Sequence, residues 1–103
     1  MTGSGRWEKC SCAEKVLDLY SLLNTVEKMA KASITPEIDK ILMLHHVQKA
    51  EKACEVDLSD VKEKVEEGYE ALEEDNYRKA SSSFFWAKTE LKSKISECVW
   101  EKP

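Results

Sequence analysis

Four stretches of the sequence carry apolar residues at three- and four-residue spacing, and this periodicity constrains the fold more than any other feature. The first stripe begins near Cys12 and ends near Ala32, and the second runs over residues 35–55. The third spans residues 58–72, and the fourth covers residues 77–98. Such spacing gathers apolar side chains on one face of a helix. The sequence therefore predicts an all-α protein.

Short breaks between the stripes predict how the helices are connected. Thr35 as N-cap and Pro36 at the first helical position predict the start of the second helix, and Asp57 and Ser59 predict the start of the third. The segment 73–76 predicts a short turn before the fourth. Because short connections force consecutive helices to lie antiparallel, we expect an up-down-up-down four-helix bundle. Without a break near Asp57, helices two and three fuse and three helices remain.

A chain of 103 residues has room for one domain. We expect a flexible N-terminal arm over residues 1–9, because this segment is polar and carries two glycines. Residues 10–103 are then a single helical bundle. The expected core comprises Leu17, Leu23, Ile38, Ile41, Val61, Val65, Leu72, Phe84 and Leu91.

The charge balance limits the classes of partner. Charged residues make up 35% of the chain and the formal net charge is −4, which argues against direct attachment to nucleic acid or anionic lipid. No stretch approaches the roughly 18 apolar residues of a membrane span, and no apolar segment typical of a secretory signal is present. We expect a cytoplasmic protein. The scarcity of Asn and Gln beside abundant Lys and Glu is a pattern reported for hyperthermophile proteins.

The four cysteines allow three interpretations. In the expected bundle, Cys10, Cys12, Cys54 and Cys98 all fall at one pole. They could bind a metal ion, although a structural zinc site usually contains a pair of ligands two to four residues apart. Disulfides that tie Cys10 and Cys12 to Cys54 or Cys98 use the same geometry, and such bridges occur inside hyperthermophile cells. In the third interpretation, Cys54 and Cys98 are small core residues and the others are free thiols.

Residues 81–86 form an unusual segment for a helix interior, three serines followed by three aromatic residues. Phe84 belongs to the apolar stripe, and Phe85 and Trp86 cannot both share its face. Large exposed aromatic residues are enriched at protein interfaces. Phe85 and Trp86 are therefore the candidate interaction residues.

Residues 61–95 resemble a tetratricopeptide-like helical hairpin. The resemblance rests on Gly68, Ala71, Tyr77, Ala80 and the later pair Phe84 and Ala87. The segment is also similar to hairpins in small archaeal helical-bundle proteins of unknown function and to the helical partner domain of minimal nucleotidyltransferases. Arg78 has no histidine four to six residues after it, so the resemblance does not imply the nuclease activity of that second family. A repeat array is excluded, because no second copy exists in residues 10–55.

No constellation of residues predicts a catalytic site or a cofactor. We expect a non-enzymatic protein–protein interaction module that uses an aromatic surface on the last helix to bind itself, as a homodimer, or another protein. The alternative is an accessory subunit or domain in a nucleic-acid metabolism assembly. That alternative predicts that the scattered lysines gather on one folded face: Lys49, Lys52, Lys79, Lys88, Lys92 and Lys94.

Overall fold

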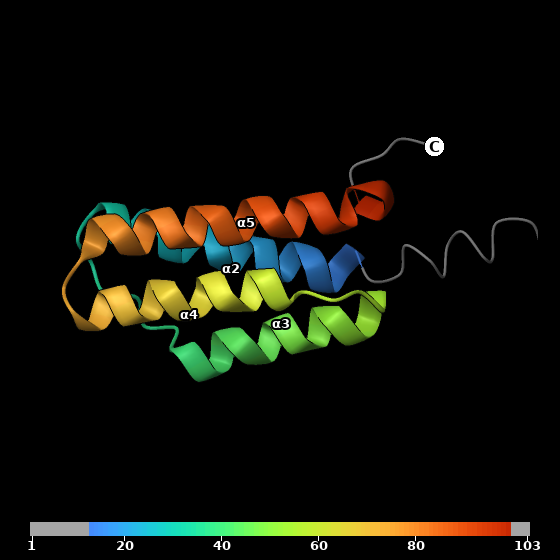
Figure 1. The fold of residues 1–103 in the computed structure, drawn as a ribbon, viewed down its shortest axis with the longest axis horizontal. Helices are drawn as coiled ribbons and strands as arrows, with labels where there is room; N and C mark the ends of the chain where they lie inside the picture. The colour runs from blue at the N-terminus through green and yellow to red at the C-terminus, as the bar shows by residue number, and fades with distance from the viewer. Residues whose placement is uncertain (1–12, 100–103) are drawn as a thin grey trace, which may run out of the picture.

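The computed structural model of this chain is a bundle of four helices (Figure 1). It describes the backbone of residues 13–99 and the side chains of residues 14–94. The helices are α2 (Ala13–Lys31), α3 (Lys40–Cys54), α4 (Ser59–Glu73) and α5 (Tyr77–Val99), and the backbone described contains no strand. The predicted all-α class is confirmed, whereas the predicted arm over residues 1–9 lies outside the described residues.

The helices form a closed ring of neighbours. Helix α5 packs extensively against α2 and α4, and α3 packs less extensively against the same two helices. Consecutive helices run antiparallel, so the start of α2 and the ends of α3 and α5 lie at the same end of the molecule (Figure 1). This arrangement confirms the predicted up-down-up-down topology.

The core is formed by the apolar stripes of all four helices. Phe84 of α5 is fully buried and its ring meets the Tyr69 ring edge-on, with 5.3 Å between ring centroids. Seven of the nine residues expected in the core are buried or partly buried: Leu23, Ile38, Val61, Val65, Leu72, Phe84 and Leu91.

Two of the expected core residues, Leu17 and Ile41, are exposed. Ile41 is 79% exposed and lies almost opposite Met43 and Val47, the buried residues of α3. Leu17 follows the buried Val16 and is turned by about 100° from it around the helix. The prediction was wrong for both because their stripes are wider than the area that neighbouring helices cover.

Helix α3 begins four residues later than the sequence predicted. Asp39 is its N-cap, and its carboxylate accepts a hydrogen bond of 2.8 Å from the backbone N–H of Leu42. Thr35 is no cap, because its hydroxyl instead lies 3.1 Å from the Tyr77 hydroxyl. The Tyr69 hydroxyl donates a 2.6 Å hydrogen bond to the carbonyl of Ile38. Contacts to α4 and α5 thus hold residues 35–38 out of the helix.

The other helix boundaries agree with the sequence. Glu55 ends α3 in a left-handed conformation, so α3 and α4 do not fuse. The Asp57 carboxylate accepts a hydrogen bond from the backbone N–H of Ser59 at the start of α4. At the predicted turn, Asp75 is left-handed and Asn76 caps α5 through a 3.2 Å hydrogen bond from the Lys79 N–H.

Candidate interaction surface on α5

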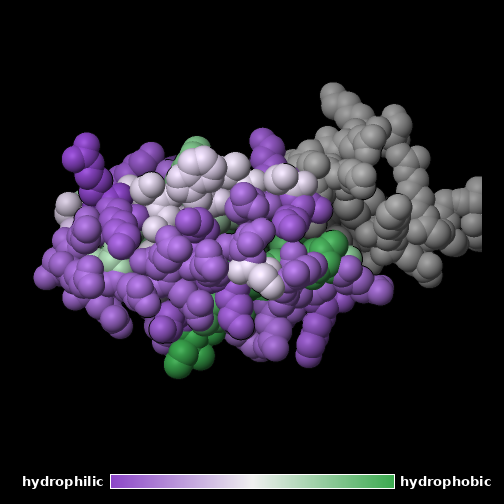
Figure 2. Space-filling view, in the orientation of Figure 1, coloured by the Kyte–Doolittle hydropathy of each residue, from purple (hydrophilic) through white to green (hydrophobic). Residues whose placement is uncertain are grey.

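Two neighbouring aromatic side chains of α5, Phe85 and Trp86, lie on the surface. Phe85 is 49% exposed and Trp86 is 50% exposed, and their rings meet edge-on with centroids 6.1 Å apart. Because Phe84 points into the core, the next two residues are turned by about 100° and 200° away from it. We call these two residues the aromatic pair. The space-filling view shows a pale area over α5 in a mostly purple surface (Figure 2).

A buried ion pair supports the Phe85 side of the aromatic pair. Lys88, one turn after Phe85, places its ammonium 2.6 Å from the carboxylate of Glu27 on α2. Its Nζ also donates a 2.9 Å hydrogen bond to the side-chain oxygen of Asn24. The same ammonium lies 5.6 Å from the centre of the Tyr20 ring and 5.8 Å from that of Phe85. The Lys88 ammonium therefore lies between the Phe85 ring and the side chains of α2.

The charge of Glu27 is maintained although the residue is only 4% exposed. Burial by itself raises the pKa of this carboxyl, but the ammonium groups of Lys88 and Lys31 outweigh the burial, so its pKa lies below the ordinary value. Lys31 lies 3.1 Å from the other carboxylate oxygen. The contact between the Lys88 ammonium and Glu27 Oε1 is an ion pair whose angles lie outside hydrogen-bond geometry.

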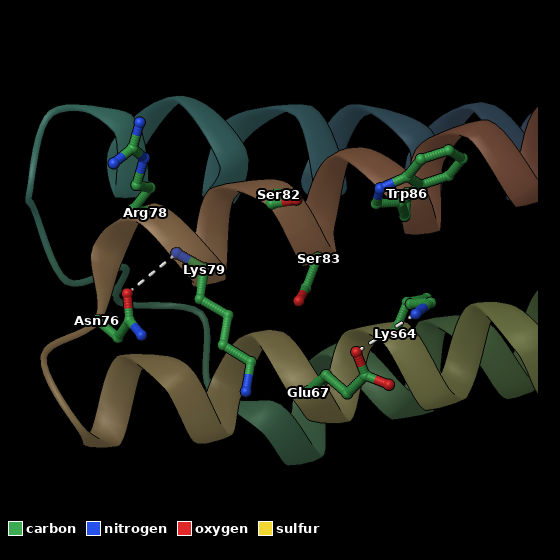
Figure 3. A pocket seen from close by; sticks show the side chains of 8 residues that line it. All are labelled: Lys64, Glu67, Asn76, Arg78, Lys79, Ser82, Ser83 and Trp86. Carbon is green, nitrogen blue, oxygen red and sulfur yellow. Dashed lines mark hydrogen bonds and ion pairs between the residues drawn. The ribbon is translucent and has the colours of Figure 1, made fainter.

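On the Trp86 side, a polar groove of about 580 Å³ runs between α4 and α5 (Figure 3). The Lys79 side chain reaches from α5 toward α4, and the Ser83 side chain points into the gap between the two helices. Lys64 on α4 forms an ion pair of 3.4 Å with Glu67. The remaining lining residues are Asn76, Arg78, Ser82 and Trp86.

The cysteine pole is described only in part. Cys54, at the end of α3, is partly buried and is joined in a disulfide bond. Cys10, Cys12 and the side chain of Cys98 lie outside what the structure describes. No group of three or more His, Cys, Asp or Glu side chains that could hold a metal ion occurs among the described residues.

The scattered lysines lie on two different helices. Lys49 and Lys52 are on α3, whereas the other four are on α5, across the bundle diagonal. Lys88 is buried with Glu27, and Lys94 lies 3.9 Å from Asp60. The six lysines therefore do not form a continuous basic face.

Sequence reasoning missed the groove and a second exposed apolar area. The groove needs residues from two helices whose relative rotation no periodicity reports. Ile34, Ile41 and Leu42 are exposed near the start of α3, where Figure 2 shows green atoms. The sequence could have predicted part of this exposure, because Ile41 and Leu42 are adjacent in a helix and cannot both point to the same face.

Comparisons with protein families, curated proteins and solved structures find no match to this chain. No helix within residues 13–99 is long and apolar enough to cross a membrane.

Proposed function

We propose that this chain is a non-enzymatic protein–protein interaction module whose contact surface is the aromatic pair on α5. The observation that carries the proposal is the exposure of two adjacent large rings on a helix that is firmly packed on both flanks. Aromatic residues supply much of the binding energy at interfaces, because they bury large apolar areas with little loss of side-chain entropy. The proposal includes a cytoplasmic location, where a hyperthermophile would retain the Cys54 disulfide.

The contacts around the aromatic pair support this proposal. The Phe85 ring lies beside the Lys88 ammonium, which is bound by Glu27 and Asn24 of α2. Trp86 meets Phe85 edge-on. A surface that is ordered before binding loses less conformational freedom on association than a mobile one. The aromatic pair therefore has the properties of an interface anchor.

Sedimentation velocity at micromolar concentration tests self-association through this surface. We expect the wild-type chain to form a dimer and Trp86→Glu to be a folded monomer, because the substitution places a charge in an apolar contact. Ile41→Glu is the matched control, since it makes the same kind of change at the 79% exposed residue of α3 and should leave the dimer intact.

The outcomes separate the surfaces. A dimer that survives Trp86→Glu but dissociates with Ile41→Glu would assign the interface to α3 and overturn the proposal. If the wild-type chain is a monomer at every concentration, the expected partner of the aromatic pair is a different protein and not a second copy of this chain. Unfolding of Trp86→Glu, seen by circular dichroism, would make Trp86 a structural residue and remove the anchor.

The second function, an accessory domain in nucleic-acid metabolism, has less support. It was expected to bring the lysines together, and Lys49 and Lys52 lie across the bundle from those of α5. The similarity of residues 61–95 to a tetratricopeptide-like hairpin, and to the partner domain of minimal nucleotidyltransferases, stays a prediction. A filter-binding assay with single-stranded and double-stranded DNA and RNA tests this function directly, and salt-sensitive binding would favour it.

A further inference from the structure

The groove between α4 and α5 joins the aromatic pair at Trp86. Lys79, Ser83 and Trp86 are spaced by four and three residues, so they lie in one row along α5 on the side that borders α4. A cation, a hydroxyl and an indole ring thus follow one another along α5, with the Trp86 ring at the edge of the groove (Figure 3). This order matches a ligand that carries a negative group beside an apolar group.

Ser83 gives the groove an unused hydrogen-bonding group. The residue is only 6% exposed, and its side chain points into the gap between the helices (Figure 3). No hydrogen bond to its hydroxyl is seen within the described part of the chain. Ser83 Oγ is not one of the fully buried atoms that lack a partner, so water in the groove reaches it. A ligand carboxylate in the groove would accept a hydrogen bond from this hydroxyl.

The charge of the groove selects an anion. Lys64 is neutralised in part by Glu67, but neither Arg78 nor Lys79 forms an ion pair among residues 14–94. Four residues that line the groove are charged, and their net charge is positive because Lys64, Arg78 and Lys79 are cationic and Glu67 is anionic. An anionic group bound here would compensate the positive charges that exceed the single carboxylate of Glu67 in the groove.

We propose that this groove binds an acidic peptide segment of another protein. One carboxylate lies at Lys79 and Ser83, and a neighbouring apolar side chain packs on Trp86. The inference rests on the proposed function, because Trp86 belongs to both surfaces. It adds the chemistry of the partner, an acidic segment with a bulky apolar residue close to its carboxylates.

A peptide library displayed on phage, selected on the purified full-length chain, tests the inference. We expect enrichment of peptides that combine Asp or Glu with an adjacent Phe, Trp or Leu. A synthetic copy of a selected peptide, carrying a fluorescent label, is then titrated by fluorescence anisotropy. Lys79→Glu and Trp86→Ala should each weaken its affinity about tenfold or more, as expected for loss of a charge partner or an aromatic anchor. Ser83→Ala, which removes only the hydroxyl, should weaken it about fivefold.

Lys52→Glu is the matched charge control. It changes the net charge by the same amount as Lys79→Glu, but on the exposed part of α3, and should alter the affinity less than about twofold. Equal losses for Lys52→Glu and Lys79→Glu would show attraction by net charge alone and overturn the inference. Circular dichroism of each variant identifies a loss that comes from unfolding, and Ser83→Ala provides a readout that leaves every charge in place.

Failure of the inference differs from failure of the proposed function. Selected peptides that are not acidic, and whose binding is abolished by Trp86→Ala but not by Lys79→Glu, would leave the aromatic pair as an interaction surface and exclude the acidic groove ligand. Peptides that bind equally well to Trp86→Ala, or a selection without enrichment, would overturn the inference. The proposed function fails separately, if Trp86→Glu also leaves the wild-type dimer intact.

Discussion

Gly68 of α4 faces the ring of Phe84 on α5 at a distance that leaves no room for another carbon. A Cβ on residue 68 would lie 2.5 Å from Phe84 Cε1 and 2.8 Å from Cζ. Glycine in a helix interior costs roughly 0.5–1 kcal/mol relative to alanine, so its presence in α4 requires a compensating contact. The close approach of α4 and α5 is that contact, because it allows the Phe84 ring to be fully buried.

Gly68→Ala should therefore destabilise the protein, although alanine is the better helix former. We expect the free energy of unfolding to fall by about 1–2 kcal/mol, since the overpacking penalty of roughly 1–3 kcal/mol exceeds the gain in helix propensity. Urea denaturation followed by circular dichroism measures the change. Phe84→Leu combined with Gly68→Ala should lose less than the sum of the single changes, because the smaller side chain vacates the space. A Gly68→Ala protein that is more stable than wild type would contradict the close contact between residue 68 and the Phe84 ring.

The Glu27 carboxylate and the Lys88 ammonium link α2 to α5, and their separation should be costly. Lys88→Met leaves a buried carboxylate with Lys31 as its remaining ion-pair partner, and we expect a loss of about 2–3 kcal/mol. Thermal unfolding measures the change. Lys64→Met is the matched control, because its ion pair with Glu67 is partly exposed and should contribute less than about 1 kcal/mol. Equal losses of stability for Lys88→Met and Lys64→Met would contradict a larger contribution from the buried ion pair of Glu27.

The same ion pair predicts a dependence of stability on acid. The pKa of Glu27 is lowered in the folded chain, so the folded state binds this proton less readily than the unfolded state. Its contribution is present above the ordinary pKa of 4.5 and is lost as the pH falls toward the lower folded value. Comparison of wild type with Glu27→Gln by urea denaturation between pH 7 and pH 3 measures it. The stability difference should shrink with acid, and a constant difference would contradict the assignment.

Tyr69→Phe tests the contact that holds the segment before α3. Burial raises the pKa of the Tyr69 hydroxyl, which stays protonated and donates to the Ile38 carbonyl. Its removal should cost about 0.5–1.5 kcal/mol, because the part-buried carbonyl loses its donor. Tyr77→Phe removes the exposed contact with Thr35 and should cost less. Thermal denaturation measures the stability of both variants. A larger loss of stability for Tyr77→Phe than for Tyr69→Phe would contradict Tyr69 as the main contact to this segment.

The disulfide at Cys54 should stabilise the pole where α3 ends. Reduction should lower the free energy of unfolding by about 2–4 kcal/mol, because the cross-link restricts the unfolded chain. Cys54→Ser should reproduce this loss and become insensitive to reductant. Serine substitutions at Cys10, Cys12 and Cys98 identify the partner as the one that matches Cys54→Ser. A wild-type stability that is unchanged by reductant would contradict a stabilising bridge.

The sequence by itself determined the helices and their order. Apolar spacing located all four helices, and the turn before Tyr77 and the break near Asp57 followed from residues that favour caps and turns. Short connections then determined the antiparallel topology. Exposure of the aromatic pair followed in part from helical geometry, because three consecutive aromatic residues cannot face one core.

Only the tertiary structure decided which part of each stripe is covered and where opposite charges meet. Periodicity gives the direction of a side chain relative to its own helix, but not the rotation of that helix against its neighbours, so Leu17 and Ile41 were misplaced. In the sequence, Lys88 resembles the other surface lysines. Only the packing of α2 against α5 places its ammonium 2.6 Å from the Glu27 carboxylate. The groove depends in the same way on two helices, since the close approach at Gly68 places Ser83 and Lys79 beside α4. Burial and charge pairing between segments far apart in the chain are properties of packing, which a local pattern does not contain.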